Sequence, residues 1–172
     1  MLMQEFTEKA REAQFRQLLE ENLGRLRRIA RSYAAPDERE DLLQEMLMQL
    51  WRSLPGFDGR ASLSTWVYRI ALNTALGTLR RRYARPREHS MPHEQLLPLT
   101  PHSVGDPVDA DAILDHFLDL LAPLDRAVLM LSLDNLSYAE IARITGLSDN
   151  AVGIRLNRMK QRFEQDYVEN SA

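Results

Sequence analysis

Hydrophobic residues follow a helical period through the first half of the chain. From Phe15 onward they are spaced by one, three and four residues, which places them on one face of a helix. A second stripe runs from Leu42 to Leu54 and ends at a Pro-Gly pair. Asp37, with Glu40 three residues later, predicts the N-terminal cap of this second helix.

A third helix is predicted after a loop over residues 57–64. Apolar residues recur at the same spacing from Trp66 to Leu79, and no segment of the chain alternates with period two. The sequence therefore predicts helices without strands. Residues 1–10 and 166–172 are expected to be frayed tails.

The C-terminal half has its own helical signals. An apolar stripe over residues 113–121 precedes Pro123, and proline is favoured in the first turn of a helix. Ser137 and Glu140 have the spacing of a capping box, and Gly146 supplies the left-handed residue that ends the short helix they open. These signals predict two short helices followed by a third.

The end of the chain has the pattern of a helix-turn-helix. Ser148 is expected to cap a final helix after the glycine turn, and the small residue Ala142 lies four positions before that glycine. A small side chain lets the two helices cross closely, so the second helix could enter the major groove of DNA. The inner face of this final helix is Val152, Leu156, Met159 and Phe163.

Prolines separate the two helical halves. Five of the eight prolines fall between residues 86 and 107, where no helical period is present. The expected organisation is all-α, with a small helical domain over 1–87, a flexible acidic Pro-rich linker over 88–111 and a second small helical domain over 112–172.

Charge divides at the same place. Residues 1–87 hold 16 Lys or Arg and 11 Asp or Glu, a net charge of +5, whereas residues 88–172 hold 6 and 14, a net charge of −8. Six arginines and no acid lie within 69–87, and eight acids and no base lie within 88–125. A basic cluster suits phosphate groups, and the planar fork of arginine favours nucleic-acid or carboxylate partners.

Composition excludes several classes of protein. The 172 residues are 44% hydrophobic and 27% charged, a globular mixture. The absence of cysteine excludes disulfides, thiol catalysis and cysteine-bound zinc. No apolar run reaches the roughly 18 residues that a membrane helix needs, and the N-terminal residues lack the apolar core of a signal peptide. We therefore expect a cytoplasmic protein that does not associate with membranes.

Catalytic motifs are missing from the sequence. It has no nucleophile-base pair, phosphate-binding loop or metal-ligand spacing, so an enzyme, a cofactor and a small-molecule substrate are not expected. His89, His93 and His102 lie in the proline-rich segment, which offers no fixed frame for a metal ion. No metal site is expected.

Several motifs together resemble bacterial sigma factors. DEREDLLQEMLMQLW (37–51), FDGRASLSTWVYRIALNT (57–74) and LRRR (79–82) resemble sigma domain two, most closely that of the extracytoplasmic-function (ECF) type. LSYAEIARITGLS (136–148), with AV (151–152) and RLNR (155–158), resembles sigma domain four. The two matches cover most of the chain in the family's order. The resemblance implies a protein that binds core RNA polymerase, directs it to promoters and helps to open the duplex.

The loop over 57–64 and the helix after it are expected to bind the minus-ten element. Binding of single-stranded DNA needs cations along the backbone and aromatic groups that stack on bases, and this segment offers both. The resemblance makes the loop a pocket for a flipped base, Asn73 a reader of a base edge and the arginines phosphate contacts. The expected residues are Phe57, Arg60, Ser62, Ser64, Trp66, Tyr68, Asn73, Arg80, Arg81 and Arg82.

A polar patch on the second predicted helix is expected to bind core polymerase. Asp41, Gln44 and Glu45 are three and four residues apart and lie beside the buried stripe. In the family, the matching residues dock onto a basic coiled coil of the largest polymerase subunit, and Trp51 is assigned to the same surface. The resemblance also implies that the acidic linker threads toward the RNA exit channel, where its charge mimics RNA.

The final helix is expected to read the minus-thirty-five element. Family members often carry a basic residue where this chain has Gly153, which lowers helix stability by roughly 1 kcal/mol relative to alanine and supplies no contact. Asparagine can read adenine and an apolar side chain can touch a thymine methyl group. The expected residues are Asn150, Ile154, Arg155, Asn157, Arg158 and Lys160.

An alternative function and a possible inhibitor are also expected. The alternative is a stand-alone helix-turn-helix regulator with a helical N-terminal interaction domain. This alternative explains only the C-terminal half of the sequence. Free operator binding also favours a basic domain, whereas the sequence pI is about 5.8. Because the family commonly pairs with anti-sigma factors, a helical inhibitor covering the second helix and domain four is a possible partner.

Overall fold

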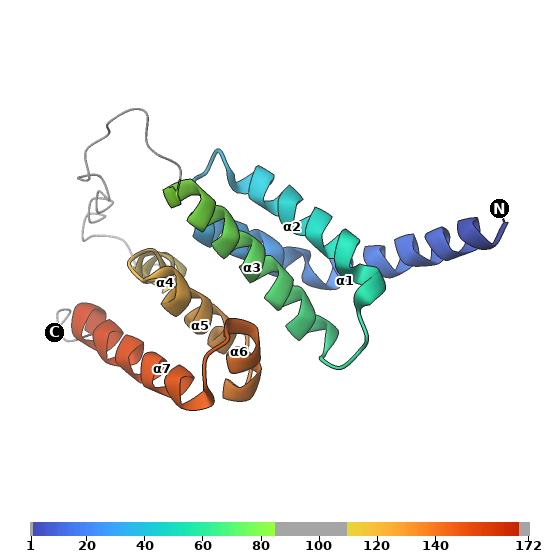
Figure 1. Ribbon diagram of the computed structural model, residues 1–172. Helices are drawn as coiled ribbons and strands as arrows, with labels where there is room; N and C mark the ends of the chain where they lie inside the picture. The colour runs from blue at the N-terminus through green and yellow to red at the C-terminus, as the bar shows by residue number, and fades with distance from the viewer. Residues whose placement is uncertain (1, 85–109, 169–172) are drawn as a thin grey trace.

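The computed structural model describes residues 2–84 and 110–168, and within these two ranges every regular element is helical (Figure 1). The all-α prediction is confirmed. The N-terminal range contains α1 (Leu2–Tyr33), α2 (Arg39–Ser53), the short 3-10 turn η1 (Leu54–Gly56) and α3 (Leu63–Ala84). The C-terminal range contains α4 (Ala110–Asp119), α5 (Pro123–Leu133), α6 (Tyr138–Thr145), α7 (Asp149–Phe163) and a final π-helical turn, η2 (Glu164–Val168).

Helices α1, α2 and α3 pack against one another as one unit (Figure 1). Their apolar stripes meet in a core where Leu26, Met46, Leu50 and Val67 are at most 1% exposed. The stripes predicted from the sequence therefore face the interior of this unit.

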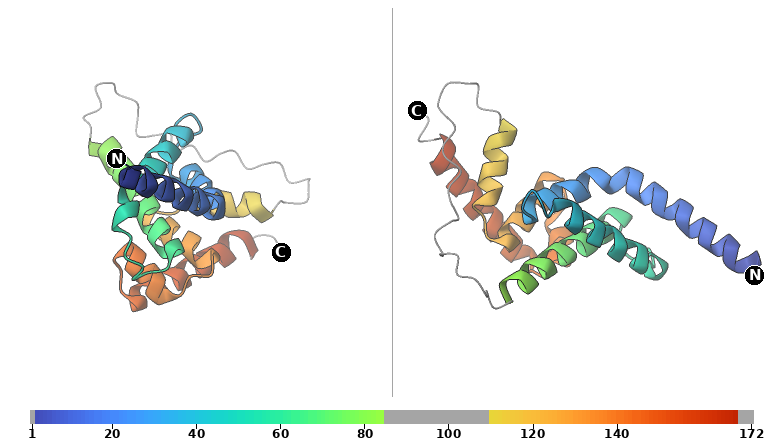
Figure 2. Two further views of the ribbon diagram at one scale, coloured as in Figure 1. Left: turned by 90° about the vertical axis from the view of Figure 1, so that its right-hand side faces the viewer. Right: turned by 90° about the horizontal axis from the view of Figure 1, so that it is seen from above.

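The expectation of a frayed tail over residues 1–10 was wrong, because α1 begins at Leu2 and runs for 32 residues. Its N-terminal end projects beyond the other helices (Figure 2). The segment contains good helix formers and neither glycine nor proline before Gly24, so nothing in the sequence stops the helix from extending toward its N-terminus. The other tail was expected to begin at residue 166, but helical backbone continues to Val168.

The cap predicted for α2 also differs. The helix begins at Arg39, its N-cap is Glu38, and no side chain bonds to its first turn. The Glu38 N–H donates to the Ala35 carbonyl at 2.9 Å, so Asp37 lies inside a turn instead of at the cap position. Two acids, Glu40 and Asp41, still lie in the first turn, where the positive end of the helix dipole favours them.

The caps predicted in the C-terminal half are confirmed. Ser137 and Glu140 form a reciprocal capping box at the start of α6, Gly146 follows α6 with a φ of 77°, and the Ser148 hydroxyl accepts from the Ala151 N–H at the start of α7. Pro123 occupies the first turn of α5. These local bonds fix the helix-turn-helix formed by α6 and α7.

The predicted linker and the histidines His89, His93 and His102 lie outside the described residues, apart from residues 110 and 111 of the linker. Helix α4 begins at Ala110, two residues before the predicted start of the second domain. The boundary at residue 87 also falls outside the described ranges and stays a prediction.

Candidate nucleic-acid and polymerase interfaces

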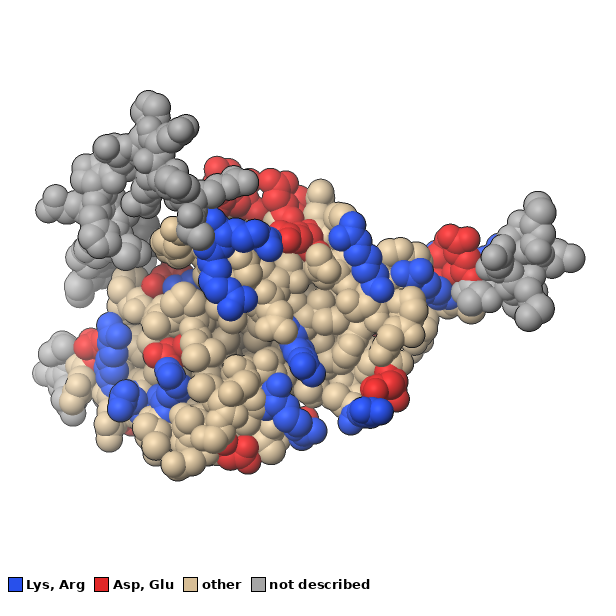
Figure 3. Space-filling model, in the orientation of Figure 1, with Lys and Arg blue, Asp and Glu red and all other residues tan. Residues whose placement is uncertain are grey.

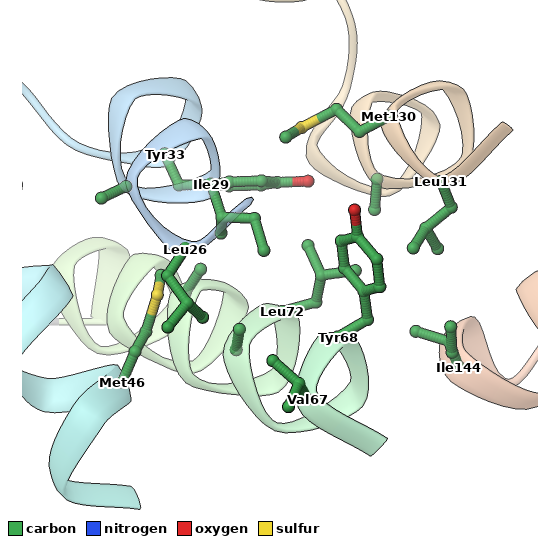
Figure 4. Close-up of a cluster of buried hydrophobic side chains, with 14 of the residues drawn as sticks. Leu26, Ile29, Tyr33, Met46, Val67, Tyr68, Leu72, Met130, Leu131 and Ile144 are labelled. Atoms are coloured by element: carbon green, nitrogen blue, oxygen red, sulfur yellow. The ribbon is translucent and has the colours of Figure 1, made fainter. Parts of the chain in front are cut away.

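The α1–α3 unit and the α4–α7 unit pack directly against each other. Figure 4 shows Tyr68 and Leu72 of α3 facing Leu131 of α5 and Ile144 of α6 in one buried cluster. Tyr68 is only 2% exposed, and its hydroxyl oxygen has no hydrogen-bond partner among the described residues. Tyr68 was expected to bind the minus-ten strand, but in this arrangement its ring is covered by the second unit and does not reach DNA.

Polar contacts surround this apolar interface. Arg28 of α1 donates two hydrogen bonds to the carboxylate of Asp134, at 2.8 and 2.9 Å. The Tyr33 hydroxyl donates to the Pro123 carbonyl at 2.8 Å, and burial raises the pKa of Tyr33 far above its usual range. Arg126 donates to the Ser32 carbonyl and lies 5.5 Å from the centre of the Tyr33 ring. The two units are thus joined by hydrogen bonds as well as by apolar packing.

The residues predicted to bind polymerase share one face of α2. Asp41 and Gln44 are exposed, and Glu45 is half-buried beside them. Glu45 accepts hydrogen bonds from Arg81 at 2.7 Å and from the Thr78 hydroxyl at 3.2 Å. The structure therefore brings the polymerase patch next to an arginine that was assigned to DNA.

A second ion pair joins α3 to the start of α2, because Arg82 of α3 lies 2.6 Å from the carboxylate of Glu38, the N-cap residue of α2. Between the two pairs, a groove is lined by Asp41, Leu42 and Leu79. Acidic and basic side chains lie side by side along this edge of the molecule (Figure 3).

Trp51 is held from two sides by α1. The Arg11 guanidinium lies 4.0 Å from the centre of the Trp51 ring, and the Phe15 ring meets it edge-on at 5.2 Å. Arg11 also donates a hydrogen bond to the Trp51 carbonyl. With these contacts on α1, the tryptophan side chain is half-buried. Periodicity alone did not point to the role of Arg11, because its partner is 40 residues away in the sequence.

The loop before α3 is shaped by local bonds. Its aromatic residue Phe57 packs on Trp66 with ring centres 5.2 Å apart, and both side chains stay partly exposed. The Ser62 hydroxyl accepts from the Thr65 N–H at 3.1 Å and so caps α3. Gly59 adopts a φ of 72°, which favours glycine at the tip of the loop.

The remaining residues assigned to the minus-ten element lie on or beside α3. Arg60 is exposed and lies 3.0 Å from the Asp58 carboxylate, and Ser64 is half-buried in the first turn. Asn73 and Arg80 are exposed farther along the helix. Except for Tyr68, all residues expected to bind the minus-ten strand keep some exposed surface.

The outward face of α7 carries most of the residues expected at the minus-thirty-five element. Asn150, Asn157, Arg158 and Lys160 are exposed, as is Ile154. The exception is Arg155, which forms an ion pair with Asp125 at the start of α5. Arg155 therefore braces α7 against α5 instead of pointing freely outward.

No helix within 2–84 or 110–168 is long and apolar enough to cross a membrane. In the same ranges, no group of three or more histidine or acidic side chains could hold a metal ion.

Comparison with known proteins assigns both halves of the fold. Residues 18–85 match the Sigma-70 region 2 family, and residues 111–163 match the Sigma-70 region 4 family. The ECF RNA polymerase sigma factor SigG of Mycobacterium tuberculosis is 34% identical over 154 residues; the match covers 74% of this chain but only 41% of that relative. The ECF sigma-E factor of Haemophilus influenzae is 28% identical over 148 residues, covering 77% of this chain and 76% of the relative.

Solved structures agree with this assignment. The sigma factor RpoE of Bartonella quintana, crystallised with the anti-sigma factor NepR, superposes with a TM-score of 0.66 at 25% identity and covers 88% of this chain and 95% of that one. CnrH, in complex with the cytosolic domain of CnrY, has the same fold, with a TM-score of 0.62 at 21% identity, covering 90% of this chain and 87% of that one.

Region 2 followed by region 4 defines the class of sigma-70-type transcription initiation proteins. Within that class, the chain belongs to the ECF sigma factors.

Proposed function

We propose that this protein binds core RNA polymerase, directs it to specific promoters and assists opening of the duplex. The observation that carries the proposal is the presence of both sigma regions in the family's order, each with an exposed polar helix face. Such a role is carried out in the cytoplasm. The alternative, a stand-alone helix-turn-helix regulator, does not account for the sigma region 2 match of the α1–α3 unit.

Polymerase docking is assigned to α2. Asp41 and Gln44 are exposed three residues apart, so a basic partner helix could reach both from one side. Glu45 would join them after giving up its pair with Arg81. Trp51, which contacts Arg11 and Phe15, lies on the same face about two turns farther along α2.

Promoter binding is divided between the two units. The Phe57–Trp66 aromatic pair and the open loop beside it would receive an unstacked base of the minus-ten strand, and Asn73 would read a base edge. Arg60, Ser62, Ser64 and the arginines Arg80, Arg81 and Arg82 would contact the backbone. The exposed face of α7 would read the minus-thirty-five element in the major groove.

A protein inhibitor is the third proposed partner. The two solved structures compared above are each complexes with a partner protein, and one of those partners is an anti-sigma factor. An inhibitor that contacts α2 and the α4–α7 unit at once would gain avidity from the connection between them, with an effective concentration near the millimolar range.

The proposal is tested by binding of the full chain to purified bacterial core RNA polymerase. The double variant Asp41→Arg, Gln44→Arg should lose stoichiometric binding while its far-ultraviolet circular dichroism is unchanged. The matched control is Gln17→Arg, Glu20→Arg, which changes one amide and one acid, also three residues apart and exposed, on α1. Full binding by the folded double variant would contradict the docking assignment, and tight, specific DNA binding by the free protein would favour the stand-alone regulator.

A further inference from the structure

Gly153 lies on the recognition helix α7, and a tyrosine ring occupies the space next to it. A Cβ atom built at Gly153 would lie 3.3 Å from Cε2 and 3.8 Å from Cδ2 of Tyr138. The first distance is tighter than nearly all real Cβ contacts, so the ring would have to move to accept any side chain there. Glycine weakens a helix, and here the ring of Tyr138 takes the space beside it.

Tyr138 is held in place from both sides. It is the first residue of α6 and follows Ser137, whose capping box with Glu140 fixes the start of that helix. Gly153 then supports one edge of the ring. The aromatic side chain is nevertheless 49% exposed, so it is positioned without being buried.

The next residue of α7 is a second exposed apolar side chain. Ile154 follows Gly153 directly and is also 49% exposed, on the helix face that carries the exposed polar residues Asn150 and Arg158. A single exposed apolar residue needs no explanation. Here, however, two large ones flank a glycine on the face that the proposed function turns toward DNA.

Base edges in the major groove offer one apolar group to such a surface, the C5 methyl of thymine. We propose that Tyr138 and Ile154 form an apolar specificity surface that reads thymine methyl groups in the minus-thirty-five element, with Tyr138 in the place that a side chain at position 153 would take. The inference rests on the proposed function and deepens it, since it names the base feature that this chain selects.

The test separates the methyl group from everything else in the base. Polymerase holoenzyme containing the full chain is used to select a promoter duplex from a random pool, and each thymine of the minus-thirty-five element is then replaced by deoxyuridine. Loss of one methyl contact should weaken binding of the parent about three- to fivefold at one or two positions. In Tyr138→Ala and Ile154→Ala, deoxyuridine and thymine should bind alike at those positions.

Two further variants control for folding. Tyr138→Phe keeps the ring and should keep the discrimination against deoxyuridine. Arg143→Ala removes an exposed charge from the same helix and should change binding of both duplexes equally.

The outcomes are distinct. The inference is overturned if the parent holoenzyme binds thymine and deoxyuridine duplexes alike at every position, or if Tyr138→Ala keeps the discrimination. Failure of the chain to form a holoenzyme at all is seen earlier, in the polymerase-binding step, and counts against the proposed function.

Discussion

Replacing Arg28 by alanine should loosen the contact between the α1–α3 and α4–α7 units. Its pair with Asp134 is the only ion pair that joins the two units within the described ranges. Minus-ten and minus-thirty-five elements are separated by about 25 base pairs, which at about 3.4 Å each amounts to roughly 85 Å of duplex. Two units in direct contact do not span that distance, so the proposed function requires this interface to open.

The size of the effect follows from the exposure of the two partners. The Arg28 side chain is 41% exposed, and an exposed pair contributes at most about 1 kcal/mol. Asp134 is only 14% exposed, so removal of Arg28 leaves a largely desolvated carboxylate with an unmet charge. We expect a loss of about 1 to 2 kcal/mol, which is about a 5- to 30-fold increase in the ratio of open to closed molecules.

Energy transfer between two dyes can measure this ratio. The natural chain has no cysteine, so cysteines introduced at the exposed positions Gln17 and Gln161 would be labelled without background. Arg28→Ala should increase the fraction of molecules with low transfer, and added salt should do the same in the parent because the pair is partly exposed. The adjacent exposed residue supplies the control, since Arg27→Ala should leave the transfer unchanged.

The reasoning would be refuted by a folded Arg28→Ala protein with the same open fraction as the parent. Asp134→Asn provides an independent check through a double-mutant cycle. If the pair acts as described, the two changes together should open the interface little more than either change alone.

Three other perturbations have outcomes fixed by the structure. Burial raises the pKa of Tyr33 in the native state, whereas its pKa in the unfolded state is about 10, so the unfolded state loses the proton first as the pH rises past 10. The free energy of unfolding should therefore fall above pH 10, and Tyr33→Phe should reduce that loss in urea titrations at pH 9 to 11. Hydrogen bonds from the Ser137 hydroxyl and backbone N–H lower the pKa of Glu140, so the cap of α6 is complete above about pH 4.3 and is lost as the pH falls further; Glu140→Gln should remove this part of the acid dependence in thermal melts. Gly146→Ala meets open space but a φ of 77°, so urea unfolding should show a loss of about 1 kcal/mol from backbone strain alone.

Local signals in the sequence predicted the local structure. Apolar spacing located the buried stripe of α2, and Ser137, Glu140 and Gly146 marked the ends of α6, because each of these features acts within four residues of itself. The shared exposure of Asp41 and Gln44 could be predicted for the same reason, since helical spacing alone puts them on one face. The start of α2 was predicted wrongly because the turn before it depends on a backbone hydrogen bond, which no side chain in the sequence indicates.

Long-range contacts could not be predicted in this way. Tyr68 shares its helix with exposed residues, and its ring is covered by residues of α5 and α6, among them Ile144, 76 positions later in the sequence. Arg155 has the spacing of an outward-facing residue, but Asp125 holds it against α5. In both cases the contacts of the side chain depend on a residue in another helix, and the periodicity of the sequence gives no information about such contacts.

In the free protein, several residues assigned to the proposed partners are engaged in contacts within the chain. Glu45 of the polymerase patch holds Arg81 of the DNA surface, and Tyr68 of the minus-ten segment is buried under the α4–α7 unit. Among the described residues the Tyr68 hydroxyl has no hydrogen-bond partner, and a buried group left unpaired in this way costs about 1 to 3 kcal/mol, which separation of the units would relieve. Polymerase binding at Glu45 would free Arg81 to contact DNA, and separation of the two units would expose Tyr68.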